Sequence, residues 1–445
     1  MSDEQARPEA PTFAQALRFW LQLGFVSFGG PAGQIALMHQ ELVERRRWIS
    51  ERRYLHALNY CMVLPGPEAQ QLATYIGWLM HGVKGGLAAG GLFVLPSLFI
   101  LIGLAWVYMA FGQTPAVAGV LWGIKPAVTA IVLFAAWRIG SRVLKNAALW
   151  VLAAAAFVAI FFMRLPFPAI VLAAGLIGAA GGRWRPDLFR ASGAHDQAAP
   201  GRGPALIDDA TPTPAHARFS RARLVRYGLV GAALWLGGFG LLMLTSGSQG
   251  VLTQMAWFFS KAALLTFGGA YAVLPYVYQG AVTEFGWLTA AQMIDGLALG
   301  ETTPGPLIMV VAFVGFVGGW ARQLFGPDSL FLAGAAAAVV VTFFTFLPSF
   351  LFILIGGPAV EATHGELKFT APLTAITAAV VGVILSLALF FALHVLWPQG
   401  WNGRFEAASA LIGLAAAVAL LRFKVNVIHL IGACAALGLL KGLLF

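Results

Sequence analysis

The feature that most constrains the fold is a series of long apolar runs with almost no charge. Examples are the segments Gly86–Phe111, Ala147–Met163, Leu330–Ile355 and Ala371–Ala392. Charged residues make up 10% of the chain, against roughly 25% in soluble domains. A helix needs about 20 apolar residues to cross ~30 Å of hydrocarbon, and only some of these runs reach that length. The chain is therefore predicted to be an all-α, polytopic membrane protein with both full spans and re-entrant segments.

Charge and cysteine content exclude other classes. The formal net charge is +10, but the Lys and Arg residues are grouped at the ends of apolar runs, where they set orientation. No nucleic-acid partner is therefore expected. Cys61 and Cys434 lie in apolar surroundings and are interpreted as small core residues. Residues 1–12 form a polar tail without a signal-peptide core, so the chain is expected to stay uncleaved.

Most of the chain consists of two copies of one unit. Three matches share an offset of 239 residues, and a fourth has an offset of 252. They pair Ser27-Phe28-Gly29-Gly30 with Thr266-Phe267-Gly268-Gly269, Trp48 with Trp287, Pro65-Gly66-Pro67 with Pro304-Gly305-Pro306, and Leu95-Pro96-Ser97 with Leu347-Pro348-Ser349. Internal duplication is a recurrent construction of secondary transporters. The predicted domains are a first repeat at 13–182, an Arg-rich linker at 183–224, a linking transmembrane helix at 225–246 and a second repeat at 247–445.

The segment Gly182–Arg226 interrupts the apolar pattern. It is rich in Pro, Gly, Ala and Arg, and holds eight Arg against four Asp. Such a composition is typical of a mobile linker. Because positive loops remain in the cytoplasm, the linker is predicted to be cytoplasmic.

Charge also orients the two copies. Five Arg lie between residues 45 and 53, whereas the counterpart Glu284–Gln292 has no Lys or Arg. Arg138, Arg142 and Lys145 end a helix in the first copy, and the equivalent Phe390–Trp397 has no such charge. The positive-inside rule therefore predicts halves of opposite orientation. The extra apolar run Val225–Thr245 supplies the odd crossing that inversion requires.

The same rule favours re-entrant helix pairs. If residues 54–80 crossed the membrane once, Arg138–Lys145 would lie outside, against the rule. A chain that turns at Pro65-Gly66-Pro67 and leaves on the side it entered keeps all these charges inside. A second pair is expected to turn at Gly29-Gly30-Pro31. Each half then has about four full spans and two re-entrant pairs. Irregular backbone at membrane depth is tolerated only where it is buried or lines a cavity, so these turns are the candidate site.

The turns have the chemistry of an anion site. Each leaves a helix N-terminus inside the membrane, where free N–H groups and the helix dipole favour negative charge. Proline suits the first helical turn, and glycine allows close approach. The predicted substrate-binding residues are Ser27, Gly29, Gly30, Pro31, Gln34, Pro65, Gly66, Pro67, Thr266, Gly268, Gly269, Thr302, Thr303, Pro304, Gly305 and Pro306. The alternative is that Gly and Pro only allow close packing and kinks.

Few ionisable residues lie inside the apolar runs, where they are expensive to bury. Glu68 and Glu301 flank the two Pro-Gly-Pro turns and could hold a proton, or could simply cap a helix. Lys125 and Lys261 could attract the anion or pair with a glutamate, or could extend to the interface. No nucleotide-binding, protease or hydrolase motif is present, and neither a cofactor nor a metal site is predicted.

These motifs resemble the long, two-domain chromate ion transporters. The resemblance is carried in the first half by Phe25–Pro31, Trp48, Leu64–Gly77 and Leu95–Ser97, and in the second by Leu265–Gly269, Leu274-Pro275, Gly286–Leu288, Thr303–Pro306 and Leu347–Ser349. It covers nearly the whole chain. It implies export of chromate across the bacterial inner membrane, driven by the membrane potential or a proton gradient, and hence chromate resistance.

Three other functions make different demands on the sequence. A carrier of another oxyanion such as sulfate would need nearly the same site, because sulfate has the same charge and shape as chromate. An anion channel would need a continuous wet path, whereas broken helices in an inverted repeat suit alternating access. A membrane-embedded enzyme would need a cluster of titratable residues, and the sequence shows none. The sequence is compatible with a homodimer.

Overall fold

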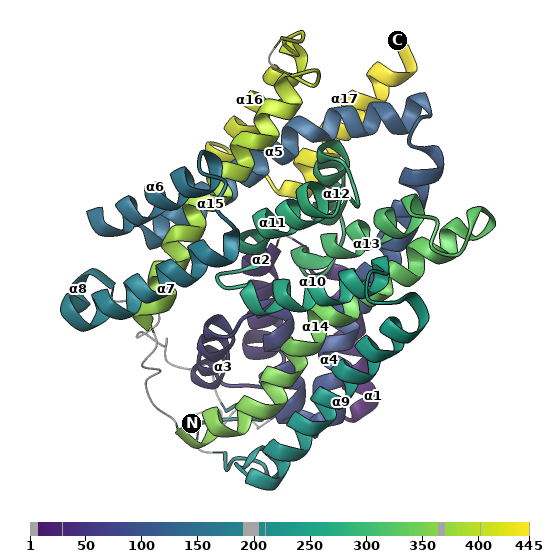
Figure 1. Cartoon of the computed structure of the whole chain (residues 1–445). Coiled ribbons are helices and arrows are strands. Elements are labelled where there is room, and N and C mark those ends of the chain that lie inside the picture. The colour runs from purple at the N-terminus through teal and green to yellow at the C-terminus, as the bar shows by residue number, and fades with distance from the viewer. Residues whose placement is uncertain are drawn as a thin grey trace, which may run out of the picture.

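The computed structural model describes residues 8–28, 30–189, 204–209, 211–363, 370–400 and 402–444, and this part of the chain is almost entirely helical (Figure 1). The first half contains α1 (Phe13–Val26), α2 (Gly30–His39), the π-helix η1 (Gln40–Arg45), α3 (Glu51–Val63), α4 (Glu68–Phe111), α5 (Pro115–Val143), α6 (Ala147–Phe161) and α7 (Phe167–Trp184). Between the halves lie α8 (Pro186–Phe189), η2 (Ala215–Ala217) and α9 (Arg221–Ser246). The second half contains α10 (Val251–Leu265), α11 (Ala270–Tyr278), the π-helix η3 (Gln279–Glu284), α12 (Ala290–Thr302), η4 (Leu307–Met309), α13 (Val310–Ala321), η5 (Pro327–Ser329), α14 (Leu330–Thr363), α15 (Thr370–Leu396), α16 (Ala407–Leu421) and α17 (Val427–Leu444).

The duplication in the sequence is confirmed in the helices. The pairs α3/α12 and η1/η3 begin and end 239 residues apart, which is the offset of the sequence motifs. The long α4 is the counterpart of α13 and α14 together, because it bends at His81-Gly82 where the second half has a loop. Gly82 adopts φ +64° at this bend, a conformation that glycine reaches without a steric penalty.

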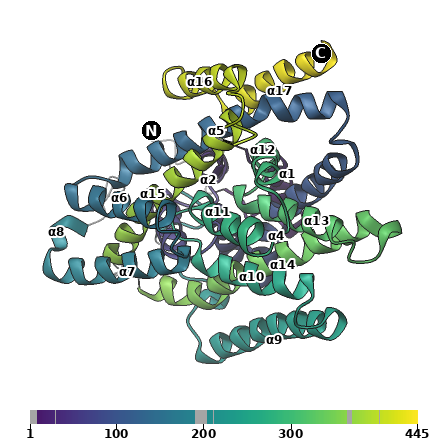
Figure 2. The same cartoon turned by 45° about the horizontal axis from the view of Figure 1, so that its top comes forward.

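The central helix of each half packs against outer helices of the other half. The long α5 packs on α16 and α17 of the other half, and its counterpart α15 packs on α6 and α7 (Figures 1 and 2). Small residues allow this close approach. A methyl group added at Gly123 would lie 2.2 Å from the Cys434 carbonyl oxygen, and one at Gly178 would lie 2.7 Å from the Ala371 carbonyl oxygen. Each half is therefore completed by the other.

The contacts also show the relative direction of the halves. Gly119 and Gly123 of α5 meet Gly438 and Cys434 of α17 respectively, so α5 and α17 are antiparallel. Gly140 of α5 and Ala153 of α6 lie against the adjacent residues Val381 and Gly382 of α15, so the chain reverses at 144–146. Asn146 before α6 donates to the Leu188 carbonyl beyond α7, so the chain reverses again at 162–166, and α7 runs in the same sense as α5. Consequently α7 and its counterpart α17 run in opposite directions, as an inverted repeat requires.

Helix lengths separate full spans from shorter segments. Seven of the described helices are long and apolar enough to cross a membrane, namely α4, α5, α7, α9, α14, α15 and α17. This gives three per half rather than the expected four, because α6 and α16 have 15 residues each. The arms α3 and α12 have 13 residues, about 20 Å at 1.5 Å per residue, which suits a re-entrant arm. The linking helix α9 lies at the edge of the bundle in Figure 2, where it packs on α10 and α14, and most of its surface is exposed.

The prediction of a mobile linker is wrong for the part of the linker that the structure describes. Residues 190–203 and 210 lie outside the described part, but α7 extends to Trp184 and α9 begins at Arg221. Between them, Ile207 pairs with Ile49 in a parallel β-bridge, donating to the Trp48 carbonyl at 3.0 Å. Ile207 and Ala217 are buried. The described linker is therefore docked, through apolar residues whose pairing partners lie about 160 positions earlier in the chain.

We expect the α5–α17 contact to be sensitive to a single methyl group. Gly438→Ala would place that group 2.1 Å from the Gly119 carbonyl oxygen, and such overpacking typically costs about 1–3 kcal/mol. Gly432→Ala on the same helix is the control, because nothing lies within 4 Å of the added group. The melting temperature of the detergent-purified protein should fall only for Gly438→Ala. Equal melting temperatures would contradict the tight crossing.

Candidate anion site and the charge pairs between the halves

Each half has two helix breaks, a Phe-Gly-Gly motif and a Pro-Gly-Pro turn. The Pro-Gly-Pro turn of each half contacts the chain beside the Phe-Gly-Gly motif of the other half, and these two contacts are called crosswise below. The Gly66 N–H donates to the Thr266 carbonyl at 2.7 Å, and the Gly305 N–H donates to the Ser27 carbonyl at 2.8 Å. Each Pro-Gly-Pro turn is thus bonded to the Phe-Gly-Gly break of the other half. Since unpaired backbone groups are costly away from water, these bonds stabilise breaks that would otherwise be left open.

Glycine is required at these turns by the backbone and by its neighbours. Gly66 and Gly305 adopt φ +128° and +99°, and Gly30, Gly268 and Gly269 also have positive φ. A methyl group at Gly66 would lie 2.6 Å from Ser349 Oγ, and one at Gly305 would lie 2.8 Å from Ser97 Cβ. Gly29 lies outside the described residues.

The prolines stand at the helix ends where the sequence placed them. Pro67 is the N-cap of α4 and Pro306 that of η4, while Pro31 is in the first turn of α2. Pro65 and Pro304 precede the two turn glycines. The positive ends of α4 and of the η4–α13 segment are therefore both located at the crosswise contacts.

The predicted hydroxyl donors are occupied within their own helices. Ser27 and Thr266 donate to the carbonyls of Leu23 and Ala262, four residues back. Thr302 and Thr303 donate to carbonyls three residues back, those of Leu299 and Gly300.

Gln34, by contrast, makes hydrogen bonds at one of the contacts between the halves. Its Nε2 donates to the carbonyls of Gly305 at 2.6 Å and Ser27 at 3.2 Å, so it fastens one crosswise pair.

Glu301 lies three residues before Pro304 of the second Pro-Gly-Pro turn and is buried. Its Oε1 accepts a short hydrogen bond from the Tyr271 hydroxyl. Glu68 is instead half-buried in the first turn of α4, where the helix dipole favours a carboxylate.

The two lysines have separate roles. Lys125 Nζ lies 3.3 Å from Oδ2 of Asp295, a buried carboxylate on α12 that also accepts a hydrogen bond from Tyr108 at 3.0 Å. Lys261 lies over the ring of Trp257, 5.7 Å from its centroid. The pairing of Lys125 with a carboxylate is thus found, but the partner is an aspartate rather than a glutamate.

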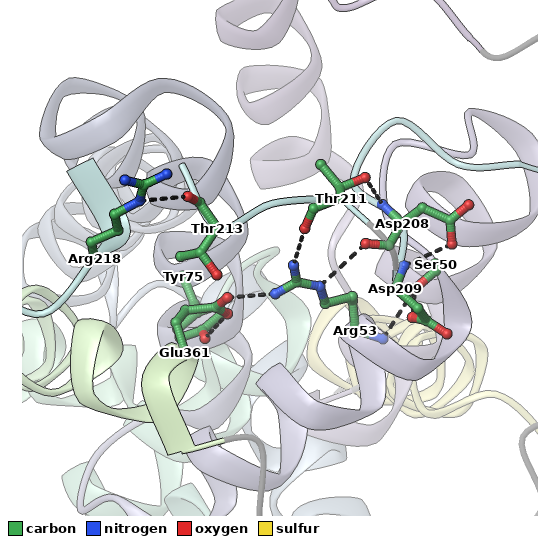
Figure 3. A network of polar contacts seen from close by, with 9 residues as sticks. All are labelled: Ser50, Arg53, Tyr75, Asp208, Asp209, Thr211, Thr213, Arg218 and Glu361. Carbon is green, nitrogen blue, oxygen red and sulfur yellow. Dashed lines mark hydrogen bonds and ion pairs between the residues drawn. The ribbon is translucent and has the colours of Figure 1, made fainter. Parts of the chain in front are cut away.

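A second ion pair between the halves lies where the docked linker crosses them (Figure 3). Arg53 Nη1 is 2.5 Å from Glu361 Oε2, and both side chains are buried. Glu361 Oε1 accepts a hydrogen bond from Tyr75 at 2.5 Å. The same guanidinium donates to the linker carbonyls of Thr211 at 2.9 Å and Asp208 at 3.4 Å. Arg53 therefore joins α3, α14 and the linker.

The two ion pairs between the halves share one plan. Each combines a cation from the first half, a carboxylate from the second half and a tyrosine that donates to the carboxylate. Glu301 likewise accepts from a tyrosine. These carboxylate sites do not contain repeat-equivalent residues, because the counterparts of Asp295, Glu301 and Arg53 at the 239-residue offset are His56, Met62 and Gln292. Sequence reasoning missed Asp295 and Glu361. The only sequence signal for these two residues was a carboxylate in or at the end of an apolar run. Their partners lie in the other half, far away in the sequence, so the pairing was not visible.

Inverted repeats whose broken helices meet between the halves are the architecture of secondary membrane transporters. Comparison with known proteins narrows this class. The chromate transporter family model matches residues 14–179 and 253–439. The chain therefore belongs to the chromate transporter family, and it is a multi-pass membrane transporter and not an enzyme.

Relatives match over most of their length. The chain is 33% identical to a chromate transport protein of Pseudomonas aeruginosa over 85% of this chain and 81% of the relative. It is 29% identical to one from Cupriavidus metallidurans over 93% of this chain and 90% of the relative. A probable chromate transport protein of Synechococcus elongatus is 28% identical, covering 84% and 83% respectively. No solved structure matches the chain.

We expect the Arg53–Glu361 pair to couple the halves strongly. Glu361→Gln leaves a buried guanidinium unpaired and should destabilise the protein by about 3–5 kcal/mol. Glu41→Gln removes the partner of Arg45, whose side chain is 63% exposed, and should cost at most ~1 kcal/mol. The measurement is thermal unfolding in detergent.

A double-mutant cycle separates the pair from each residue's other contacts. Arg53→Met and Glu361→Leu together should cost less than the sum of the two single changes, since neither charge is then left unpaired. Additive losses would contradict the pairing.

Proposed function

We propose that the protein is a secondary active transporter that exports chromate across the bacterial inner membrane and thereby confers chromate resistance. The observation that carries the proposal is the crosswise bonding of the four helix breaks between the halves. Membership of the chromate transporter family and the names of the relatives support chromate as the substrate.

Anion binding is proposed to compete with those crosswise bonds. The N–H groups of Gly66 and Gly305 now donate to neutral carbonyls of the opposite half. Hydrogen bonds to a charged acceptor are roughly twice as strong as those to a neutral one. A chromate dianion at the helix N-termini would therefore displace the carbonyls, and displacement would loosen one half from the other. Binding and rearrangement are linked because they use the same donors.

The charge pairs are proposed to close the path at different depths. Arg53–Glu361 lies beside the linker, on the side that the Arg distribution assigns to the cytoplasm. Lys125 lies near the opposite end of α5 from Arg138 and Arg142, so its pair with Asp295 is assigned to the outer part. Rocking of the halves would open one pair while the other stays closed.

The membrane potential can drive export without another ion. An inside-negative potential favours exit of negative charge by roughly 2.3 kcal/mol per charge per 100 mV, and chromate carries two charges. A proton gradient is the second candidate, because Glu301 and Asp295 are buried carboxylates beside the breaks and the outer pair. A second function, transport of another oxyanion such as sulfate, uses the same donors, and donors discriminate such isosteres poorly.

The proposed function is tested by chromate uptake into energised, everted membrane vesicles with and without excess sulfate. The parent should accumulate chromate in the presence of sulfate. Gly66→Leu should abolish uptake, because a side chain there meets Ser349 within 2.6 Å. Gly91→Leu is the control, since nothing lies within 4 Å of its added atom. Equal accumulation of sulfate would indicate a general oxyanion carrier, and absence of energised uptake of either anion would refute transport.

The driving force is tested in the same vesicles. Valinomycin with potassium, which removes the potential, should lower chromate accumulation at least tenfold, since two charges at 100 mV correspond to more than a hundredfold gradient. Nigericin, which removes the pH gradient, should leave it nearly unchanged. The reverse pattern would show that protons drive export.

A further inference from the structure

Each Pro-Gly-Pro turn faces a serine of the other half. A methyl group at Gly66 would lie 2.6 Å from Oγ of Ser349, and one at Gly305 would lie 3.3 Å from Oγ of Ser97. These serines end the two Leu-Pro-Ser motifs, which lie within α4 and α14. The hydroxyls therefore adjoin the two crosswise contacts, although neither serine belongs to a helix break.

Both hydroxyls are buried and unpaired. Ser97 is 0% exposed and Ser349 is 1% exposed, and neither Oγ has a hydrogen-bond partner among the described residues. Other buried hydroxyls on the same helix behave differently, since Thr342 and Thr345 of α14 donate to carbonyls four residues back. An unsatisfied buried polar group destabilises a folded protein, so its retention in both halves needs an explanation.

The unpaired serines occur at equivalent places in both repeats, whereas the ion pairs do not. A feature kept in both repeats is a better candidate for a role at the repeated turns. Among the described residues, three hydroxyl oxygens are completely buried and lack a hydrogen-bond partner, and two of them occupy equivalent places in the repeat. Each also has a glutamine amide at the same turn. Gln71 Nε2 donates to the Pro65 carbonyl, and Gln34 Nε2 donates to the Gly305 carbonyl. Two polar subsites of one composition, glycine N–H, serine hydroxyl and glutamine amide, are thus formed from residues of both halves.

We propose that Ser97 and Ser349 are substrate-contacting residues, whose hydroxyls donate to oxygens of the transported tetrahedral oxyanion once it displaces the crosswise carbonyls. The inference rests on the proposed function and extends its site to two residues outside the breaks. A fully ionised oxyanion offers acceptors only, and each serine supplies one unused donor beside a turn N–H. Substrate would thereby satisfy the two hydroxyls that the chain itself leaves unpaired.

The test compares Ser97→Ala, Ser349→Ala and the double variant with the parent. Each single change should raise the KM for chromate uptake into everted vesicles about tenfold, the effect of losing one hydrogen bond to a charged group. The double change should raise KM further. Thr345→Val is the control on α14, because its hydroxyl is bonded within the helix, and its KM should match the parent's.

A second readout excludes a merely structural role. Since the serine hydroxyls have no partner to lose, the alanine variants should melt at or above the parental temperature without ligand, whereas the stabilisation produced by added chromate should shrink. Parental KM and parental chromate stabilisation in both variants would overturn the inference. A lowered melting temperature without ligand, with chromate stabilisation intact, would overturn it too.

The two proposals fail separately. If parent vesicles take up neither chromate nor sulfate, transport is refuted, and stabilisation of the purified protein by chromate or sulfate then tests the serines alone. Loss of that stabilisation in the alanine variants would support the anion contact, and its persistence would refute it. If the parent transports chromate and the serine variants do so with parental KM, only the serine inference fails.

Discussion

The structure depends on two backbone hydrogen bonds, from Gly66 to Thr266 and from Gly305 to Ser27. A broken helix inside a membrane leaves polar groups that no water can satisfy. Here each half supplies the partner that the other half lacks, and the packing of α5 and α15 against the other half extends the same dependence to the outer helices. Each repeat therefore needs the other to satisfy its backbone groups and to cover its helices.

Duplication and asymmetry have different purposes in this chain. The backbone scaffold repeats, down to equivalent π-helices and equivalent unpaired serines. The ion pairs between the halves do not repeat, because both cations come from the first half and both carboxylates from the second. A symmetric scaffold gives the two sides of the membrane similar frameworks. Asymmetric ion pairs allow those sides to differ in the strength with which the halves are joined.

The proposed anion site would use hydrogen-bond donors rather than fixed charges. The chain places neutral N–H, hydroxyl and amide groups at the breaks, and Arg53 and Lys125 are already paired with carboxylates. Under the proposed function, a dianion would be attracted through the helix dipoles. Its release would then not require a strong ion pair to be broken.

The sequence by itself determined the membrane class, the repeat, its inversion and the positions of the turns. Apolar length, loop charge and turn chemistry are local properties, and the motifs at one offset made the duplication visible. Tertiary structure alone decided that Ser27 and Thr266 contribute carbonyls rather than hydroxyls, that Asp295 is the partner of Lys125, and that Ile207 docks the linker. Each of these is a contact between residues more than 150 positions apart, and in a membrane interior the burial and pairing of a polar group depend on such distant partners rather than on its neighbours in the chain.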